Sequence, residues 1–195
     1  MSKKTIIVIV EWCIAIVLVF LFFRLDDAYF GSLTPMKAHE LSERSYHYGP
    51  SKIVREVHFD DNTTVYLGVY KDWFSADTVI KQGLGWYPGG GVAGMKIDSS
   101  KSLTYNWGIT SRDKKLSLAQ FYGYVTDPEI TSVVLNTLTL NGDDSDVRTP
   151  ASMSQDINDD QMFLFIWNDK DLNSNWVSIQ GLDREGKVRY EQKLN

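Results

Sequence analysis

Cysteine is nearly absent from this sequence of 195 residues, and the single one, Cys13, lies inside an apolar segment near the N-terminus. The remainder of the chain therefore cannot form a disulfide between its own residues. This excludes a small scaffold stapled by several disulfides, as in many secreted eukaryotic domains. It agrees with a cytosolic domain, or with an exported bacterial domain large enough to fold without staples.

Clusters of basic residues are also missing. The chain carries 20 Lys and Arg against 25 Asp and Glu, for a net charge of −5, and Lys114-Lys115 is the longest basic pair outside the N-terminus. Proteins that bind nucleic acids need a basic patch or stripe. We therefore expect no nucleic-acid partner.

Signatures of metal binding and catalysis are scarce. The three histidines, His39, His47 and His58, lack both the helical i, i+4 spacing of zinc proteases and cysteine partners. No serine lies in a glycine elbow, and the many carboxylates form no specific pair. The sequence therefore predicts no transition-metal ion, no cofactor and no enzyme, with a cell-envelope hydrolase as the alternative.

One long apolar run is present, from Thr5 to Phe23, and its 19 residues would span about 28 Å as a helix, close to the hydrocarbon thickness of a bilayer. The run continues into Arg24 and Leu25, unlike the small-residue cleavage site of a signal peptide. Cys13 follows Glu11 and Trp12, which does not fit lipoprotein processing. We expect residues 1–24 to form a short cytoplasmic tail and an uncleaved transmembrane anchor.

Flanking charges set the expected orientation of this anchor. Lys3 and Lys4 precede the run, whereas Arg24 is offset by Asp26 and Asp27. By the positive-inside rule the N-terminus lies in the cytoplasm and the C-terminal domain lies outside a cell membrane crossed once.

Glu11 is the polar exception within the run. It could pair with another membrane protein or form a hydrogen bond in a homo-oligomer. Alternatively, it is protonated or reaches toward the cytoplasmic side, tolerated because of its apolar neighbours.

After the anchor, residues 25–50 are expected to form a stalk or linker with a short helix starting at Thr34-Pro35 and stopping by Gly49-Pro50. Residues 51–195 form the expected extracytoplasmic domain. Strand patterns cover 53–59, 63–70, 102–110, 116–125, 130–140 and 162–167, with a closing hairpin around residues 184–186. Residues 73–81 fit either a strand or a helix, and 141–160 read as a loop. The fold class is mainly β, an antiparallel β-sandwich-like domain.

Two loops have ligand-like patterns. Gly89 to Gly94 fits G-x-G-x-x-G by letter, but no helical pattern follows it, so a flexible loop is favoured over a phosphate site. Asp169, Asp171, Asn173 and Asn175 alternate as calcium ligands do, although Ser174 and Gln180 replace the glycine and glutamate of a calcium loop. A second acidic cluster follows Asn141. Each could bind calcium or be a solvated turn.

Aromatic residues gather around the glycine-rich loop. They could stack on sugars or on a partner's anchor residues, or they could fill the core and edges of a sandwich. The candidates for binding are Trp86, Tyr87, Trp107 and Tyr122. The first two are the stronger candidates, because they are expected in a loop and loops often carry binding residues.

The segments GYVTDPEITSVVLN and WVSIQGLDREGKVRYE resemble parts of small membrane-anchored exported proteins of Bacillus-type Gram-positive bacteria. The resemblance covers about the last eighty residues and consists of structural turns. It implies a location and a β fold but no activity. Together these observations predict a membrane-anchored binding module at the outer membrane face, whose partner is another membrane protein or a cell-wall polymer.

Overall fold

The computed structural model describes residues 3–27, 31–111, 116–140, 148–170 and 174–194. These residues form two helices and twelve strands, and every pair of neighbouring strands is antiparallel. The chain divides into two compact units, residues 1–31 and residues 32–195. The predicted mainly antiparallel β class is confirmed.

The first unit contains helix α1, Lys3–Asp27. Large apolar side chains from Ile6 to Val19 are exposed in every direction around this helix. Within the described part of the chain, no helix combines the length and the apolar character needed to cross a membrane.

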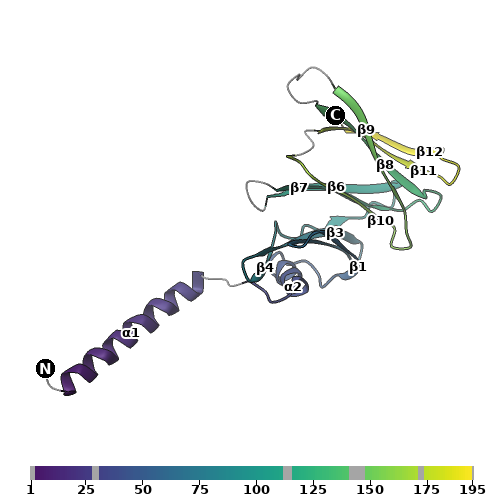
Figure 1. Ribbon diagram of the computed structural model, residues 1–195. Helices are drawn as coiled ribbons and strands as arrows, with labels where there is room; N and C mark the ends of the chain where they lie inside the picture. The colour runs from purple at the N-terminus through teal and green to yellow at the C-terminus, as the bar shows by residue number, and fades with distance from the viewer. Residues whose placement is uncertain (1–2, 28–30, 112–115, 141–147, 171–173, 195) are drawn as a thin grey trace. The chain divides into compact units, whose positions relative to one another are not determined.

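The second unit is built in layers, visible in Figure 1 as helix α2 below three stacked sheets. Sheet A contains strands in the order β1-β2-β3-β4, with β5 also paired to β3. Its strands are β1 (Lys52–Asp60), β2 (Thr63–Tyr70), β3 (Trp73–Gln82), β4 (Gly85–Pro88) and β5 (Met95–Lys96).

Sheet B is the middle layer, with the order β10-β7-β6, and sheet C follows with the order β12-β11-β8-β9. Sheet B contains β6 (Leu103–Ser111), β7 (Ser117–Val125) and β10 (Met162–Asn168). Sheet C contains β8 (Ser132–Leu140), β9 (Arg148–Asp156), β11 (Ser174–Leu182) and β12 (Val188–Lys193).

Strands β7 and β10 of sheet B are buried on both faces because each face packs against another sheet. Phe121 and Phe163 belong to the core shared with sheet C, whereas Tyr122 and Met162 belong to the core shared with sheet A. Successive side chains of a strand point to opposite faces, so neighbours in β7 and in β10 serve different cores. The continuous apolar run of β10 follows from this position.

Helix α2, Pro35–Ser45, covers the outer face of sheet A. Thr34 caps it, because the Thr34 hydroxyl accepts a hydrogen bond from the Lys37 backbone N–H at 3.3 Å. Ala38 packs with Tyr66 and Val79 of the sheet in a small apolar cluster. The sequence placed this helix in a stalk of residues 25–50, whereas the structure assigns residues 32–50 to the same compact unit as the sheets.

The secondary structure of two segments differs from the sequence prediction, and that of a third settles an alternative that the sequence left open. Residues 73–81 are a strand. The prediction of a loop over residues 141–160 is wrong for β9. This strand is polar and lacks the apolar alternation by which a strand is recognised in a sequence, but it pairs with β8 along its length. Strands β4 and β5, in the glycine-rich region, were not expected. The finished unit has three sheets rather than the two of a simple sandwich.

Candidate functional site

A groove lined by aromatic side chains lies beside the C-terminal end of α2. Its volume is about 460 Å³, within the range of ligand sites. Three segments far apart in the sequence meet there: the chain leaving α2, the turn between β2 and β3, and the loop before β5. The lining residues are Tyr46, His47, Tyr48, Tyr70, Lys71, Trp73, Val92, Ala93 and Gly94.

The glycine-rich loop forms one wall of this groove by packing against two tyrosines. A Cβ atom at Gly91 would lie 2.0 Å from the Tyr46 ring, and one at Gly94 would lie 2.2 Å from the Tyr48 ring. Gly91 also has a φ of 82°, which other residues adopt with strain. The loop therefore contains glycine because the rings lie against its backbone. β5, and no helix, follows it, so the phosphate site that the sequence analysis disfavoured lacks its helix here as well.

The turn between β2 and β3 forms the opposite wall. Tyr70 pairs with Trp73 across this two-residue turn, and Lys71 takes a φ of 57° there. The Lys71 ammonium lies 4.8 Å from the centre of the Tyr70 ring, a cation–π contact. Tyr48 meets Tyr70 edge to face at 5.7 Å. These contacts hold the rings in place before any ligand arrives.

Backbone strain is concentrated at the groove. Three non-glycine residues have a positive φ among the described residues, and two of them, His47 and Lys71, line the groove. Such conformations cost free energy and recur at binding sites, where the surrounding structure enforces them. His47 is further fixed by its Nδ1 atom, which donates to the Arg44 carbonyl oxygen at 3.2 Å.

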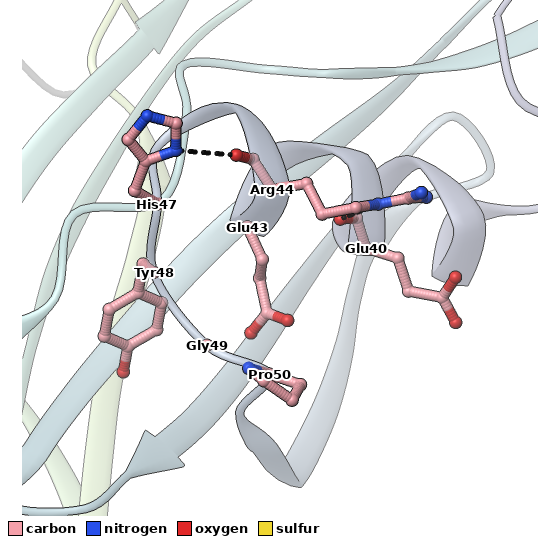
Figure 2. A pocket seen from close by; sticks show the side chains of 7 residues that line it. All are labelled: Glu40, Glu43, Arg44, His47, Tyr48, Gly49 and Pro50. Carbon is pink, nitrogen blue, oxygen red and sulfur yellow. Dashed lines mark hydrogen bonds between the residues drawn. The ribbon is translucent and has the colours of Figure 1, made fainter.

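A second hollow, of about 490 Å³, shares His47 and Tyr48 with the groove. Figure 2 shows the Glu43 carboxylate pointing toward Gly49 and Pro50 in this hollow, while the side chains of Glu40 and Arg44 extend away along the helix. Both hollows are therefore bordered by the segment His47-Tyr48.

Glu43, which lines this hollow, also belongs to a buried polar cluster that joins α2 to sheet A. Asp77 of β3 is fully buried and accepts two hydrogen bonds, from His39 Nδ1 at 2.7 Å and from the Ser42 hydroxyl at 3.0 Å. His39 Nε2 lies 3.4 Å from a Glu43 carboxylate oxygen, which accepts the Ser51 backbone N–H at 2.9 Å. Burial raises the pKa of Asp77 above its ordinary value, and the bonds from His39 and Ser42 oppose that shift.

The cluster has the residue types of a serine–histidine–aspartate triad but a different geometry. In a triad the serine hydroxyl gives its proton to the histidine. Here Ser42 donates to Asp77 instead, and its oxygen accepts the Val92 backbone N–H at 3.0 Å. Ser42 is fully buried. The arrangement fastens α2 and the glycine-rich loop to sheet A, and it thereby holds the groove in shape.

The four aromatic residues proposed from the sequence occupy different places. Trp107 of β6 is exposed, Tyr122 of β7 is buried, and both line a smaller cavity of about 200 Å³ beside the glycine-rich loop. Asn106 donates to the Tyr122 hydroxyl at 3.1 Å. Burial raises the pKa of Tyr122 to about 12. Trp86 and Tyr87 lie in β4 and line neither this cavity nor the aromatic groove.

Trp86 has a structural position in β4. It exchanges backbone hydrogen bonds with Ser32 and packs against the apolar cluster under α2. Sequence reasoning missed Tyr46, Tyr48 and Tyr70, because they lie in earlier segments of the chain and no local pattern shows that the fold brings them to the glycine-rich loop. Tyr-x-Tyr immediately before Gly49-Pro50 was the available signal.

The residues considered for metal binding lie partly inside and partly outside the described part of the chain. No group of three or more potential ligands gathers within the described residues. Asp171, Asn173 and residues 141–147, which belong to the calcium hypotheses, lie outside the described residues. Glu11 lies in α1.

Comparisons with protein-family models, curated proteins and solved structures found no match to this chain.

Proposed function

We propose that this protein is a membrane-anchored binding module that holds a carbohydrate chain of the cell envelope in its aromatic groove. The observation that carries the proposal is the meeting of Tyr46, Tyr48, Tyr70 and Trp73 around one preformed hollow.

The chemistry of the groove suits sugar rings. A pyranose ring has apolar C–H faces, which stack on aromatic side chains, and a rim of hydroxyl groups, which need hydrogen-bond partners. Tyr46 and Trp73 are both exposed and present their rings to solvent. The Tyr48 hydroxyl is buried, so we expect the backbone of the glycine-rich loop to supply polar partners along the edge. Lys71 rests on Tyr70, so the one ammonium group in the lining is already engaged.

The proposed anchor is α1. Ile6, Ile7, Val8, Ile9 and Val10 are each about half exposed, although five consecutive helical residues point in all directions. A helix that is apolar on every side needs an apolar surrounding. The described side chains of α1 end at residue 19, whereas the apolar run of the sequence continues to Phe23. We therefore propose a single-pass helix with the groove on the outer side of the membrane.

The alternative function is a hydrolase of the cell envelope. It would use Glu43 as an acid or base in the hollow of Figure 2. Glu43 is held by Ser51 and His39, and Glu40 extends elsewhere, so the two carboxylates do not converge as glycoside hydrolysis requires. This geometry supports binding over hydrolysis.

The proposal is tested by titrating the full chain, in detergent micelles, with the hexamer of N-acetylglucosamine. Isothermal titration calorimetry provides the signal, because the heat of binding does not depend on Trp73 as a reporter and can still be measured when that residue is replaced. We expect saturable binding that Trp73→Ala and Tyr46→Ala each weaken about tenfold, since an aromatic contact of this kind contributes on the order of 1 kcal/mol.

Trp107→Ala is the matched control, because Trp107 is an exposed tryptophan that does not line the groove. It should bind as the wild type does. Absence of binding by the wild-type chain, or an equal loss in all three variants, would refute a carbohydrate site in this groove.

A further inference from the structure

Strand β6 forms an edge of the central sheet and has no proline, charged side chain or bulge to protect that edge. It pairs with β7 on one side, in a register that continues from Leu103 to Ser111 without a bulge. Its nine residues include neither proline nor a charged side chain. Natural proteins commonly use such features to prevent a second strand from adding to a sheet edge.

The other edge of the same sheet, β10, is protected. Arg55 donates to the Met162 carbonyl oxygen at 2.8 Å, and the Leu164 backbone N–H donates to the Gln155 side chain at 2.8 Å. Two outward backbone groups of β10 are thus already hydrogen-bonded. Within the described residues, no side chain bonds to the backbone of β6 in this way.

The remaining edges of the described sheets also carry protection. β12 has alternating charges, β9 contains a proline, β1 has register shifts and charged side chains, and β4 is short and ends in a proline. β5 has two residues. Among the described edge strands, β6 is therefore the one without a proline, a charged side chain, a register shift or a short length.

Space and apolar surface accompany this edge. Trp107 is 54% exposed and Ile109 is 50% exposed, and both point to the same face of β6. A Cβ atom at Gly108 would meet nothing within 4 Å. Two cavities, of about 330 and 200 Å³, are lined by β6 residues and overlap at Asn106 and Trp107. An added strand would find room beside the middle of β6.

We propose that a second copy of this chain binds there, through antiparallel pairing of the two β6 strands around a two-fold axis at Trp107. The two sheets B would then form one sheet of six strands. The second copy is favoured because the strand is complementary to itself. With the axis at residue 107, Tyr105 lies opposite Ile109 of the second copy.

The central cross-strand pairs of this register are compatible with pairing. Tyr105 against Ile109 is an aromatic pair with a β-branched residue, and Trp107 meets its own copy. Asn106 lies opposite Gly108, where no Cβ atom competes for space. The absence of charge in β6 matters as well, because two-fold pairing would place any charge near a like charge.

The experiment measures the mass of the full chain in detergent micelles by light scattering coupled to gel filtration. We expect the protein mass of two chains. Ile109→Lys should halve it, because the variant introduces two ammonium groups into the paired edge. The matched control is Val188→Lys, which places the same charge on an exposed valine of β12 and should leave the dimer intact.

Two further variants separate this contact from others. Trp107→Cys, made with Cys13→Ser, should form an intermolecular disulfide under mild oxidation, since paired Cα atoms lie about 4.5–5.5 Å apart, whereas Val188→Cys should not. Glu11→Leu should keep the dimer, because the proposed contact lies at β6, and loss of the dimer in this variant would place the contact at α1 instead. A wild-type monomer, a dimer that survives Ile109→Lys, or a dimer that Val188→Lys also dissociates would overturn the proposal.

Discussion

Gly91 lies where a tyrosine ring meets the backbone of the glycine-rich loop. Both the positive φ and the contact with Tyr46 require glycine at this position. Gly186 has a similar φ of 80° in the hairpin between β11 and β12, but no atom lies within 4 Å of its would-be Cβ. The two residues therefore separate the cost of backbone strain from the cost of a clash.

We expect Gly91→Ala to destabilise the domain more than Gly186→Ala does. Gly186→Ala should lower the free energy of unfolding only by the strain of a positive φ, about 1 kcal/mol. Gly91→Ala should add to that strain the cost of displacing the Tyr46 ring. Urea unfolding monitored by tryptophan fluorescence measures both. Equal losses would show that Tyr46 does not rest on the loop in solution.

Asp77 gives the stability a defined pH dependence. Its raised pKa means that the folded state holds the Asp77 proton more tightly than the unfolded state does. The stability linked to this proton is complete below the ordinary pKa of 3.8 and declines as the pH rises through the raised pKa. His39, Ser42 and Glu43 surround the carboxyl group and set how far this range extends.

Asp77→Asn removes the titration. We expect the free energy of unfolding of the wild type, minus that of the variant, to fall as the pH is raised from about 4 to about 7. Urea titrations at several pH values measure this difference. A difference that grows with pH over this range would contradict the assigned direction of the pKa shift.

The sequence indicated part of these residue-level features. It identified the glycine-rich loop, and it named Trp107 and Tyr122, which line the cavity beside that loop, because composition and turn signals are local. It could not pair Asp77 with His39, or Gly91 with Tyr46, because these contacts join α2 to segments more than thirty residues away.

At the scale of single elements, alternation and turn residues predicted most strands. β9 was missed because an exposed edge strand needs no apolar face, and its polar sequence looks like a loop. The short helix was predicted from Thr34-Pro35, but its role was not, since the residues that fasten it, His39 and Ser42, are polar. Sequence patterns assign such residues to solvent.

Arg55 connects two elements, β1 and the edge of β10. Its guanidinium bonds to both carboxylate oxygens of Asp160, at 2.9 and 2.6 Å, and also to the Met162 carbonyl oxygen. The pair is largely buried, so its loss would leave Asp160 without a counter-charge and the β10 edge uncovered.

We expect Arg55→Ala to lower the free energy of unfolding by about 1–3 kcal/mol, as loss of a partly buried, hydrogen-bonded ion pair does. The control is Arg189→Ala, whose ion pair with Glu129 is exposed and should contribute less than about 1 kcal/mol. Urea unfolding of both variants measures the difference. An equally small effect at Arg55 would show that the β10 edge does not depend on this bond.

At the scale of the whole molecule, three surfaces have separate proposed roles. The apolar helix α1 is proposed for the membrane, the aromatic groove for a carbohydrate chain, and the edge of β6 for a second copy. Groove and edge use different residues, so each can be disabled while the other remains. The arrangement of the sheets could not be predicted from sequence, because strand patterns do not specify which edges remain open.

The proposed membrane anchor and its orientation are tested by the accessibility of the domain to protease in bacterial cells that produce the full chain. Cells are stripped of their wall and treated with protease, and the C-terminal domain is followed with an antibody. We predict membrane-bound protein whose domain is digested from outside, with a cytoplasmic marker protein intact. A domain that stays protected until the cells are lysed, or that is recovered without the membrane, would contradict the account.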